Sequence, residues 1–363
     1  MGEKKKLSKK AKGWLIAGIA VSALALFYVA PGIIAGNIVF DHLFASRLSN
    51  KEDLDGPLYD AVAAQRDFPE LSLREEVSFP SGKYQLSGYV YKPVSPKGLI
   101  LSCHGMGGQA DSNESALIPH FLAKDYAVFS FDLTASGSSE GKGWDKGLRQ
   151  GTHDVKSAEN YIKSRTDLSS LPLALVGHSV GAYGVMTSIS YDQTPFAIIA
   201  FSGYDTPNTF MIHSAAKTVG DWAYATVPTF DLVDLARYGT DSFISASDVI
   251  KSHPETPYFL IHGTKDETVD YKKSSAAYQV QKMDLPNAEI CIREGIAHAA
   301  PWLSQEAHDA YYEGMKKTKA YQKGKLTEEE FAAFALENKP KTKELDPSLF
   351  LAVDAFLDNH FPS

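Results

Sequence analysis

Apolar and polar residues follow two kinds of pattern along most of the chain, one typical of strands and one typical of helices. Short apolar runs, typical of buried strands, recur up to about residue 293, and segments with helical periodicity lie between them. In residues 152–165, for example, Val155, Ala158 and Ile162 share one helical face. Strands that alternate with helices form a mostly parallel sheet covered on both sides. The pattern therefore predicts an α/β fold.

Eight apolar runs are expected to form the strands, and the first two are expected to pair as an antiparallel hairpin around residues 80–82. They are EEVSFPSG, YQLSGYVYKP, GLILSCHG, YAVFSFDL, LPLALVGHS, PFAIIAFSG, PYFLIHGTKD and AEICIREG.

The N-terminus has a different pattern. Residues 1–13 contain six lysines and one glutamate, and no charged residue lies between Lys12 and Asp41. About 20 apolar residues cross a bilayer, so we predict a basic cytoplasmic tail at 1–13 and a transmembrane anchor at 14–35. Pro31 is expected to kink or end that helix. The lysines favour a cytoplasmic N-terminus with the rest of the chain outside. The alternative is a signal peptide cleaved near residues 23–25.

The rest of the chain divides into a connector and one large domain. Residues 36–71 are mixed and polar and are expected to be the connector, and residues 72–363 the domain. Two insertions are expected within the domain. Residues 204–254 separate the sixth and seventh strands, and residues 304–343 form a charged helical segment for which a solvated surface hairpin is the simplest interpretation.

Composition limits the function. The net charge of the 363 residues is −8, although the tail is basic, so the domain is acidic and a poor partner for nucleic acid. Cys103 and Cys291 lie inside apolar runs, which favours two free thiols over a disulfide. No cluster has metal-ligand spacing, so neither a metal nor a cofactor is expected.

The fifth apolar run ends in GHSVG, residues 177–181. A G-x-S-x-G between a strand and a helix makes a sharp turn, because the glycines let strand and helix approach closely. This turn exposes the serine hydroxyl at the edge of the sheet where ligands bind. We therefore predict that Ser179 is a nucleophile.

A serine nucleophile needs a base, and the base needs an acid to orient it. Asp266 follows the seventh predicted strand and His298 follows the eighth, which gives the order Ser, Asp, His and places all three on one edge. Asp205, at the end of the sixth strand, is an alternative acid. Asp270 and Glu267 are expected to cap the following helix.

Hydrolysis also needs hydrogen-bond donors for the developing oxyanion. The backbone N–H of Val180 is one expected donor, and the N–H of Met106, in the glycine-rich loop after the third strand, is the other. His104 and His262, each before a glycine at a strand end, are expected to brace their loops.

These residues resemble the α/β-hydrolase superfamily over roughly residues 72–363. The resemblance is strongest to monoacylglycerol-lipase-like and serine-aminopeptidase-like proteins, through HGMGG, FDLTASGSSEG, GHSVGA, HGTKDETV and GIAH. It implies an eight-stranded sheet, a helical cap at 204–254, a Ser179–Asp266–His298 triad and an oxyanion hole at Met106 and Val180. The loop after the fourth strand departs from the family pattern, because it lacks an arginine and a glycine.

The expected function is hydrolysis of a small or lipid-like carboxylic ester with an apolar acyl part, by a membrane-anchored serine hydrolase. Aromatic residues of the cap are expected to form the cap's own core, with some facing the triad as an apolar pocket. A serine peptidase and a non-catalytic binding protein of the same fold are the alternatives. The seven aromatic residues are Tyr204, Phe210, Trp222, Tyr224, Phe230, Tyr238 and Phe243.

Overall fold

A computed structural model describes residues 8–62, 74–110, 116–189 and 194–362. Residues 1–7 of the predicted tail and residues 63–71 of the predicted connector lie outside these ranges. Eight strands form one sheet in the order β1-β2-β4-β3-β5-β6-β7-β8. They are β1 Arg74–Ser81, β2 Tyr84–Tyr91, β3 Gly98–Cys103, β4 Tyr126–Phe131, β5 Leu173–His178, β6 Ala197–Phe201, β7 Tyr258–Gly263 and β8 Ala288–Arg293.

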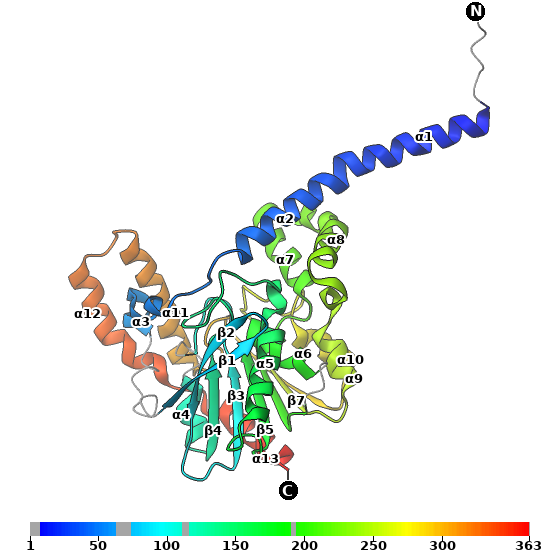
Figure 1. The fold of residues 1–363 in the computed structure, drawn as a ribbon. Coiled ribbons are helices and arrows are strands. Elements are labelled where there is room, and N and C mark those ends of the chain that lie inside the picture. Colours follow the sequence, from blue (N-terminus) through cyan, green and yellow to red (C-terminus); the bar gives the residue numbers. More distant parts are fainter. Residues whose placement is uncertain (1–7, 63–73, 111–115, 190–193, 363) are drawn as a thin grey trace, which may run out of the picture.

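Strand β2 pairs antiparallel with both β1 and β4, and the other pairs are parallel, as the sequence pattern predicts. Two buried clusters cover the two faces of the sheet. Helices α5, α6, α9 and α10 supply one cluster, and α4 and α13 supply part of the other (Figure 1). These helices are α4 Leu117–Leu122, α5 Gln150–Ser164, α6 Val180–Ser188, α9 Ala246–Ser252, α10 Ala276–Met283 and α13 Pro347–His360.

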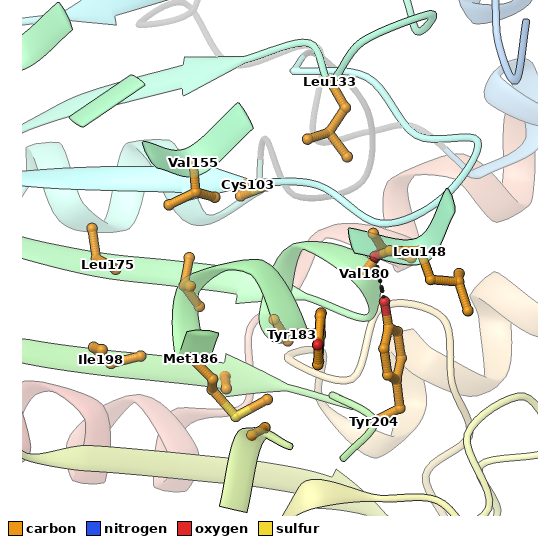
Figure 2. Close-up of a cluster of buried hydrophobic side chains, with 14 of the residues drawn as sticks. Cys103, Leu133, Leu148, Val155, Leu175, Val180, Tyr183, Met186, Ile198 and Tyr204 are labelled. Atoms are coloured by element: carbon orange, nitrogen blue, oxygen red, sulfur yellow. Dashed lines mark hydrogen bonds between the residues drawn. The ribbon is translucent and has the colours of Figure 1, made fainter. Parts of the chain in front are cut away.

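Alternation along the strands divides their side chains between the clusters. Leu99, Leu101 and Cys103 of β3 join the α5–α6 side, whereas Ile100 joins the α4–α13 side. Figure 2 shows how α6 lies against the sheet with Val180, Tyr183 and Met186 beside the strands. The core therefore fixes the position of β5 and α6, the two elements that flank GHSVG.

The cap region between β6 and β7 is helical, and Figure 1 shows its part before α9 gathered at one end of the sheet. Its elements before α9 are α7 Pro207–Val219, the 3-10 segments η8 Asp221–Thr226 and η9 Gly239–Phe243, and α8 Val227–Tyr238. Another 3-10 turn, η6 Gly147–Arg149, precedes α5.

The N-terminal helix differs from its predicted bounds of 14–35. It runs unbroken as α1 Lys9–Leu24, a π turn η1 Ala25–Val29 and α2 Ala30–Phe44. Pro31 neither ends nor interrupts it, because the proline falls in the first turn of α2, just after the wider π turn, where its missing N–H costs little. By length and composition, this helix is a candidate to cross a membrane.

Residues 36–44 belong to that helix rather than to a polar connector. Phe40 and Phe44 are buried, and the Phe40 ring lies 5.9 Å from the rings of both Phe230 and Tyr238 in the cap. Phe44 stacks on Trp144 with ring centroids 6.0 Å apart. The sequence pattern did not predict this packing, because the last turns of the helix belong to the same apolar run as the predicted anchor. Nothing in that run distinguishes residues that face lipid from residues that pack on the cap.

The charged insertion is more than a solvated hairpin. It forms α11 Gln305–Gln322, α12 Glu328–Asn338 and η10 Lys339–Lys343, which pack around α3 Pro57–Val62; α3 follows the short 3-10 segment η2 Lys51–Asp55. Asn338 donates to the carbonyl of Ala61 and Thr342 to that of Val62. The insertion therefore covers part of the predicted connector.

Candidate active site

Ser179 lies in the turn between β5 and α6 with φ 55° and ψ −114°, a conformation that is strained for a residue with a side chain. The flanking glycines make this turn possible. A Cβ at Gly181 would collide with the carbonyl oxygen of Cys103, and a Cβ at Gly177 with that of Gly181. The turn is thus the sharp strand-to-helix elbow that the motif predicts.

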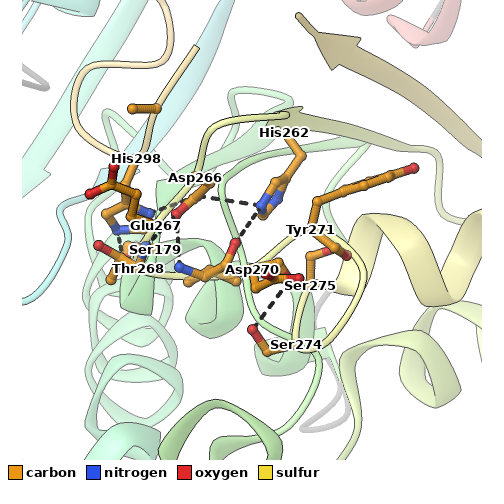
Figure 3. A network of polar contacts seen from close by, with 12 residues as sticks. Ser179, His262, Asp266, Glu267, Thr268, Asp270, Tyr271, Ser274, Ser275 and His298 are labelled. Carbon is orange, nitrogen blue, oxygen red and sulfur yellow. Dashed lines mark hydrogen bonds and ion pairs between the residues drawn. The ribbon is translucent and has the colours of Figure 1, made fainter. Parts of the chain in front are cut away.

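The predicted trio comes together at this elbow (Figure 3). His298 Nε2 lies 3.0 Å from Ser179 Oγ, and His298 Nδ1 lies 2.8 Å from Asp266 Oδ2. The Asp266 carboxylate is fully buried and the His298 side chain is 15% exposed. A neutral imidazole with its proton on Nδ1 satisfies both contacts, because Nδ1–H donates to the carboxylate while Nε2 accepts from the hydroxyl.

Asp266 is held as an ionised acceptor. Its Oδ1 accepts hydrogen bonds from the backbone N–H groups of Thr268 and Val269, at 2.9 and 2.7 Å. Burial alone would raise the pKa of Asp266, but its interactions with His298 and His262 outweigh burial, so the pKa lies below the usual value. His262 is also buried, and its Nε2 contacts both the Val269 carbonyl and Asp266 Oδ2. It braces this loop, as expected.

The backbone around His298 is held on both sides by residues that the sequence did not single out. On α11, His308 Nε2 accepts from the N–H of Ala297 and the Tyr312 hydroxyl accepts from the N–H of Ala299. His178 Nε2 donates to the carbonyl of His298 itself, at 3.0 Å. The spacing of His308 and Tyr312, one helical turn apart, is the only sequence signal that pointed to them.

The glycine-rich loop after β3 lies against the elbow. A Cβ at Gly105 would lie only 3.3 Å from Ser179 Cβ, so the backbone of this loop passes close to Ser179. His104 Nε2 accepts from the N–H of Leu133 and its Nδ1 contacts the Gly105 carbonyl, which confirms its bracing role. Met106 follows in the same loop with its side chain partly exposed, and Val180 begins α6.

The loop after β4, which departs from the family pattern, is braced from elsewhere in the chain. Arg47, which follows α2, donates to the carbonyl oxygens of Gly137, Ser139 and Gly141. Asp132 accepts from the N–H groups of Ala110 and Ser138. An arginine therefore does hold this loop, but it comes from the N-terminal segment.

The alternative acid lies elsewhere. Asp205 Oδ1 accepts from the hydroxyl of Ser245 and the N–H of Ser247, at the start of α9. Asp270 accepts from the backbone N–H groups of Lys272 and Lys273 in the turn before α10, and the N-cap of α10 is Ser275, so the predicted helix cap at Asp270 is wrong. Among the described residues, Asp266 is the carboxylate that contacts the His298 ring.

The cap aromatics fall into two groups. Tyr204, Phe210, Phe230 and Tyr238 pack with the core, and Tyr204 donates to the carbonyl of Leu148 (Figure 2). The other three are exposed. Two of these line a cavity of about 510 Å³ between α7, α8 and η9. The exposed residues are Trp222, Tyr224 and Phe243, of which the last two line the cavity.

Cys103 and Cys291 are free thiols, as predicted. In the part of the chain that the structure describes, no three histidine, cysteine, aspartate or glutamate side chains are placed to bind a metal ion together.

Comparisons with known proteins agree with this architecture. The model of the serine aminopeptidase family S33 matches residues 94–255, a stretch that includes Ser179 and ends before Asp266. The protein YfhR of Salmonella typhi is 23% identical over 204 residues, which cover 56% of this chain and 65% of that protein. The quorum-quenching protein AidA of Acinetobacter baumannii is 27% identical over 128 residues, or 34% of this chain and 42% of AidA.

Among solved structures, the esterase Pf2001 of Pyrococcus furiosus aligns with a TM-score of 0.50 and 20% identity, covering 70% of this chain and 95% of the esterase. At this identity the likeness shows the fold. The strand order, the serine elbow and the matched family model together show that this chain has the α/β-hydrolase fold.

Proposed function

We propose that this protein is a serine hydrolase that cleaves carboxylic esters with an apolar acyl part. The observation that carries the proposal is the hydrogen-bonded series Ser179–His298–Asp266 at a strained elbow. Such a series removes the proton of a serine hydroxyl at the moment when the oxygen attacks.

In the proposed reaction, Ser179 Oγ attacks the ester carbonyl carbon while its proton passes to His298 Nε2. The carbonyl oxygen becomes an oxyanion that accepts from the N–H groups of Met106 and Val180. The intermediate collapses, the carbon–oxygen bond to the alcohol breaks, and His298 returns the proton to the departing alcohol. Water then attacks the acyl-serine by the same route. Asp266 keeps the imidazole in the required tautomer and offsets its positive charge.

The cap is the part of the structure that supports an apolar acyl group in the substrate. Ile212, Val227 and Phe243 contribute apolar surface to the 510 Å³ cavity in the cap, and a cavity of this size accommodates a medium acyl chain. The matched family model favours a second candidate, an aminopeptidase. That activity would also need a carboxylate placed to bind a substrate amine.

We also propose that residues 14–35 anchor the enzyme in a membrane with its N-terminus in the cytoplasm and the catalytic domain outside. The lysines before the uncharged helix support this orientation. In sealed cells, a protease added outside should digest the catalytic domain. Full protection until lysis would reverse the orientation, and a mature chain that begins after residue 25 would indicate cleavage.

The reaction is tested by covalent labelling with a fluorophosphonate, which reacts with activated serines. We expect labelling at Ser179, and its loss in Ser179→Ala together with a fall in turnover of roughly 10⁴–10⁶. The matched control is Ser202→Ala, because Ser202 is also buried and follows the neighbouring strand β6. Turnover that survives Ser179→Ala would refute the mechanism. Amino-acid amides cleaved faster than any ester would favour the peptidase.

A further inference from the structure

Helix α8 of the cap packs against the N-terminal helix along one face. Thr229 and Val233 form that face, and the contact is close because α2 presents glycines there: a Cβ at Gly32 would lie 2.7 Å from Thr229, and one at Gly36 would lie 3.1 Å from Val233. One turn further on, Arg237 donates to the side chains of both Asn37 and Asp41. The candidate anchor and the cap are therefore one packed unit.

The next face of α8, which we call the apolar stripe, is exposed. At 100° per residue its members lie within one narrow sector, directly beside the sector of Thr229 and Val233. Leu232 is 47% exposed and Leu235 is 41% exposed. The apolar stripe consists of Pro228, Leu232, Leu235 and Ala236, and carries no charge.

Exposed apolar residues also occur on both neighbouring elements. In η8, Trp222 is 62% exposed, and the Tyr28 hydroxyl of the N-terminal helix donates to the carbonyl of Ala225 in the same segment. On α2, Ile34 and Ile38 are both more than 60% exposed. Tryptophan and tyrosine are the residues enriched where a protein meets the surface of a bilayer.

The uncharged part of the N-terminal helix is longer than a bilayer requires. Residues 13–40 lie between Lys12 and Asp41, and at about 1.5 Å per residue they measure about 42 Å, against a hydrocarbon thickness of about 30 Å. A helix with this excess tilts, or leaves its last turns in the headgroup region. Where the last turns lie in the headgroup region, α8, which is packed on them, lies at the membrane surface.

We propose that the apolar stripe, together with Trp222, is a second membrane contact, which rests in the headgroup region of the leaflet from which the anchor emerges. This inference rests on the proposed membrane anchoring. The occupant is a lipid surface rather than a second protein, because the stripe lies on a helix that packs directly against the candidate anchor, and the segment before it exposes a tryptophan of the kind enriched at membrane interfaces. The cap would then lie where ester lipids are most concentrated.

The test measures membrane depth in the full-length protein reconstituted in phosphatidylcholine–phosphatidylglycerol vesicles. A nitroxide is attached through Leu232→Cys in a Cys291→Ser background, since Cys103 is buried. Ile19→Cys reports on the anchor, and Leu351→Cys on α13 is the matched control because Leu351 is an exposed leucine on a helix of the catalytic domain outside the cap. Relaxation by oxygen, which enters lipid, is compared with relaxation by a water-soluble nickel complex.

We expect the ratio of oxygen to nickel accessibility at Leu232→Cys to be several-fold higher than at Leu351→Cys. A nickel-accessible label at both Leu232→Cys and Leu351→Cys, with Ile19→Cys still in lipid, would overturn the second contact and leave the anchor and the proposed function intact. A label at Ile19→Cys that is also nickel-accessible would refute the anchoring itself. A label at Leu232→Cys that is shielded from both reagents would mean that protein covers the stripe, which also overturns the proposal.

A second variant measures the consequence for substrate access. Leu232→Glu combined with Leu235→Glu should reduce hydrolysis of an ester dissolved in vesicles several-fold and leave hydrolysis of a water-soluble ester unchanged, because charges are costly in the interface. The control pair is Leu336→Glu with Leu351→Glu, two exposed leucines outside the cap. Equal loss on both esters, or equal loss in both pairs, would contradict a role in docking.

Discussion

The two sides of the candidate site are held by different forces. On the histidine side, hydrogen bonds at the N–H groups of Ala297 and Ala299 and at the carbonyl of His298 fix the backbone. On the cap side, α8 packs on α2 through close apolar contacts and aromatic rings such as Phe40. Hydrogen bonds are directional, whereas apolar packing responds to volume. Changes on the histidine side should therefore alter the rate of the chemical step. Changes on the cap side should alter the range of substrates.

The largest effect is expected at the acid. Asp266→Asn should lower kcat/KM by about 10⁴, because an amide that donates to His298 Nδ1 favours the wrong imidazole tautomer. Asp205→Asn is the matched control, since this carboxylate also lies after a strand but contacts Ser245 and Ser247. Steady-state kinetics on a soluble ester measure both. If Asp205→Asn lowers kcat/KM strongly and Asp266→Asn lowers it only slightly, Asp205 is the acid and the assignment of Asp266 is wrong.

Two buried carboxylates show what the hydrogen bonds on the histidine side achieve. Asp266 has four polar neighbours and a lowered pKa, whereas neither carboxylate oxygen of Glu159 on α5 has a hydrogen-bond partner among the described residues. Burial raises the pKa of Glu159 to about 8, from 4.5. Folding therefore favours the protonated form, and the unfolded chain releases the proton first as pH rises.

It follows that the folded protein loses stability as pH rises from about 4.5 to about 8. Glu159→Gln should remove this loss and stabilise the protein at pH 9 by about 5 kcal/mol, with little difference near pH 4. Denaturant unfolding across this range measures it. Glu329→Gln, at an exposed position on α12, is the control and should leave the free energy of unfolding unchanged at both pH 4 and pH 9. An equal pH slope in wild type and Glu159→Gln would show that Glu159 is solvated or paired.

A smaller effect is expected from one brace of the histidine loop. Tyr312→Phe removes the acceptor for the N–H of Ala299 and should lower kcat about fivefold, because one neutral hydrogen bond contributes about 1 kcal/mol. KM should stay constant, since the tyrosine acts on the position of His298 rather than on substrate. Tyr321→Phe on the same helix is the control, because this ring stacks on Phe331 away from the site. Unchanged kcat with a lower melting temperature would mean a structural role only.

The comparison also explains what the sequence could predict. Ser179, Asp266 and His298 were identifiable because each follows a strand of a parallel sheet, and the ends of parallel strands meet at one edge. Helix caps are likewise local: Asp346, directly before Pro347, accepts from the N–H groups of Ser348 and Leu349 at the start of α13. Thr327 and Glu330 form a capping box within the first turn of α12.

The contacts that the sequence did not reveal join distant segments. Arg47 reaches a loop some 90 residues away, and Tyr312 reaches Ala299 from a helix whose own periodicity signals only a surface face. Likewise, the contact of α2 with α8 depends on Gly32 and Gly36, which in sequence are ordinary small residues of an apolar helix. Such pairs leave no local pattern in the sequence, because the surroundings of each residue already explain it without the distant partner.

The smallest effect concerns the cap side, through the acyl chain. Each buried CH₂ contributes about 0.8 kcal/mol, so each added methylene should raise kcat/KM about fourfold until the pocket is full. We expect p-nitrophenyl esters to improve from acetate towards medium chains and then plateau or fall, with the full-length enzyme at one fixed detergent concentration. If the chain enters the cavity of the cap, Val227→Phe should fill part of it and move the optimum to shorter esters while acetate hydrolysis stays constant. A flat series would refute an apolar acyl pocket, and an optimum that Val227→Phe leaves unmoved would place that pocket outside the cavity.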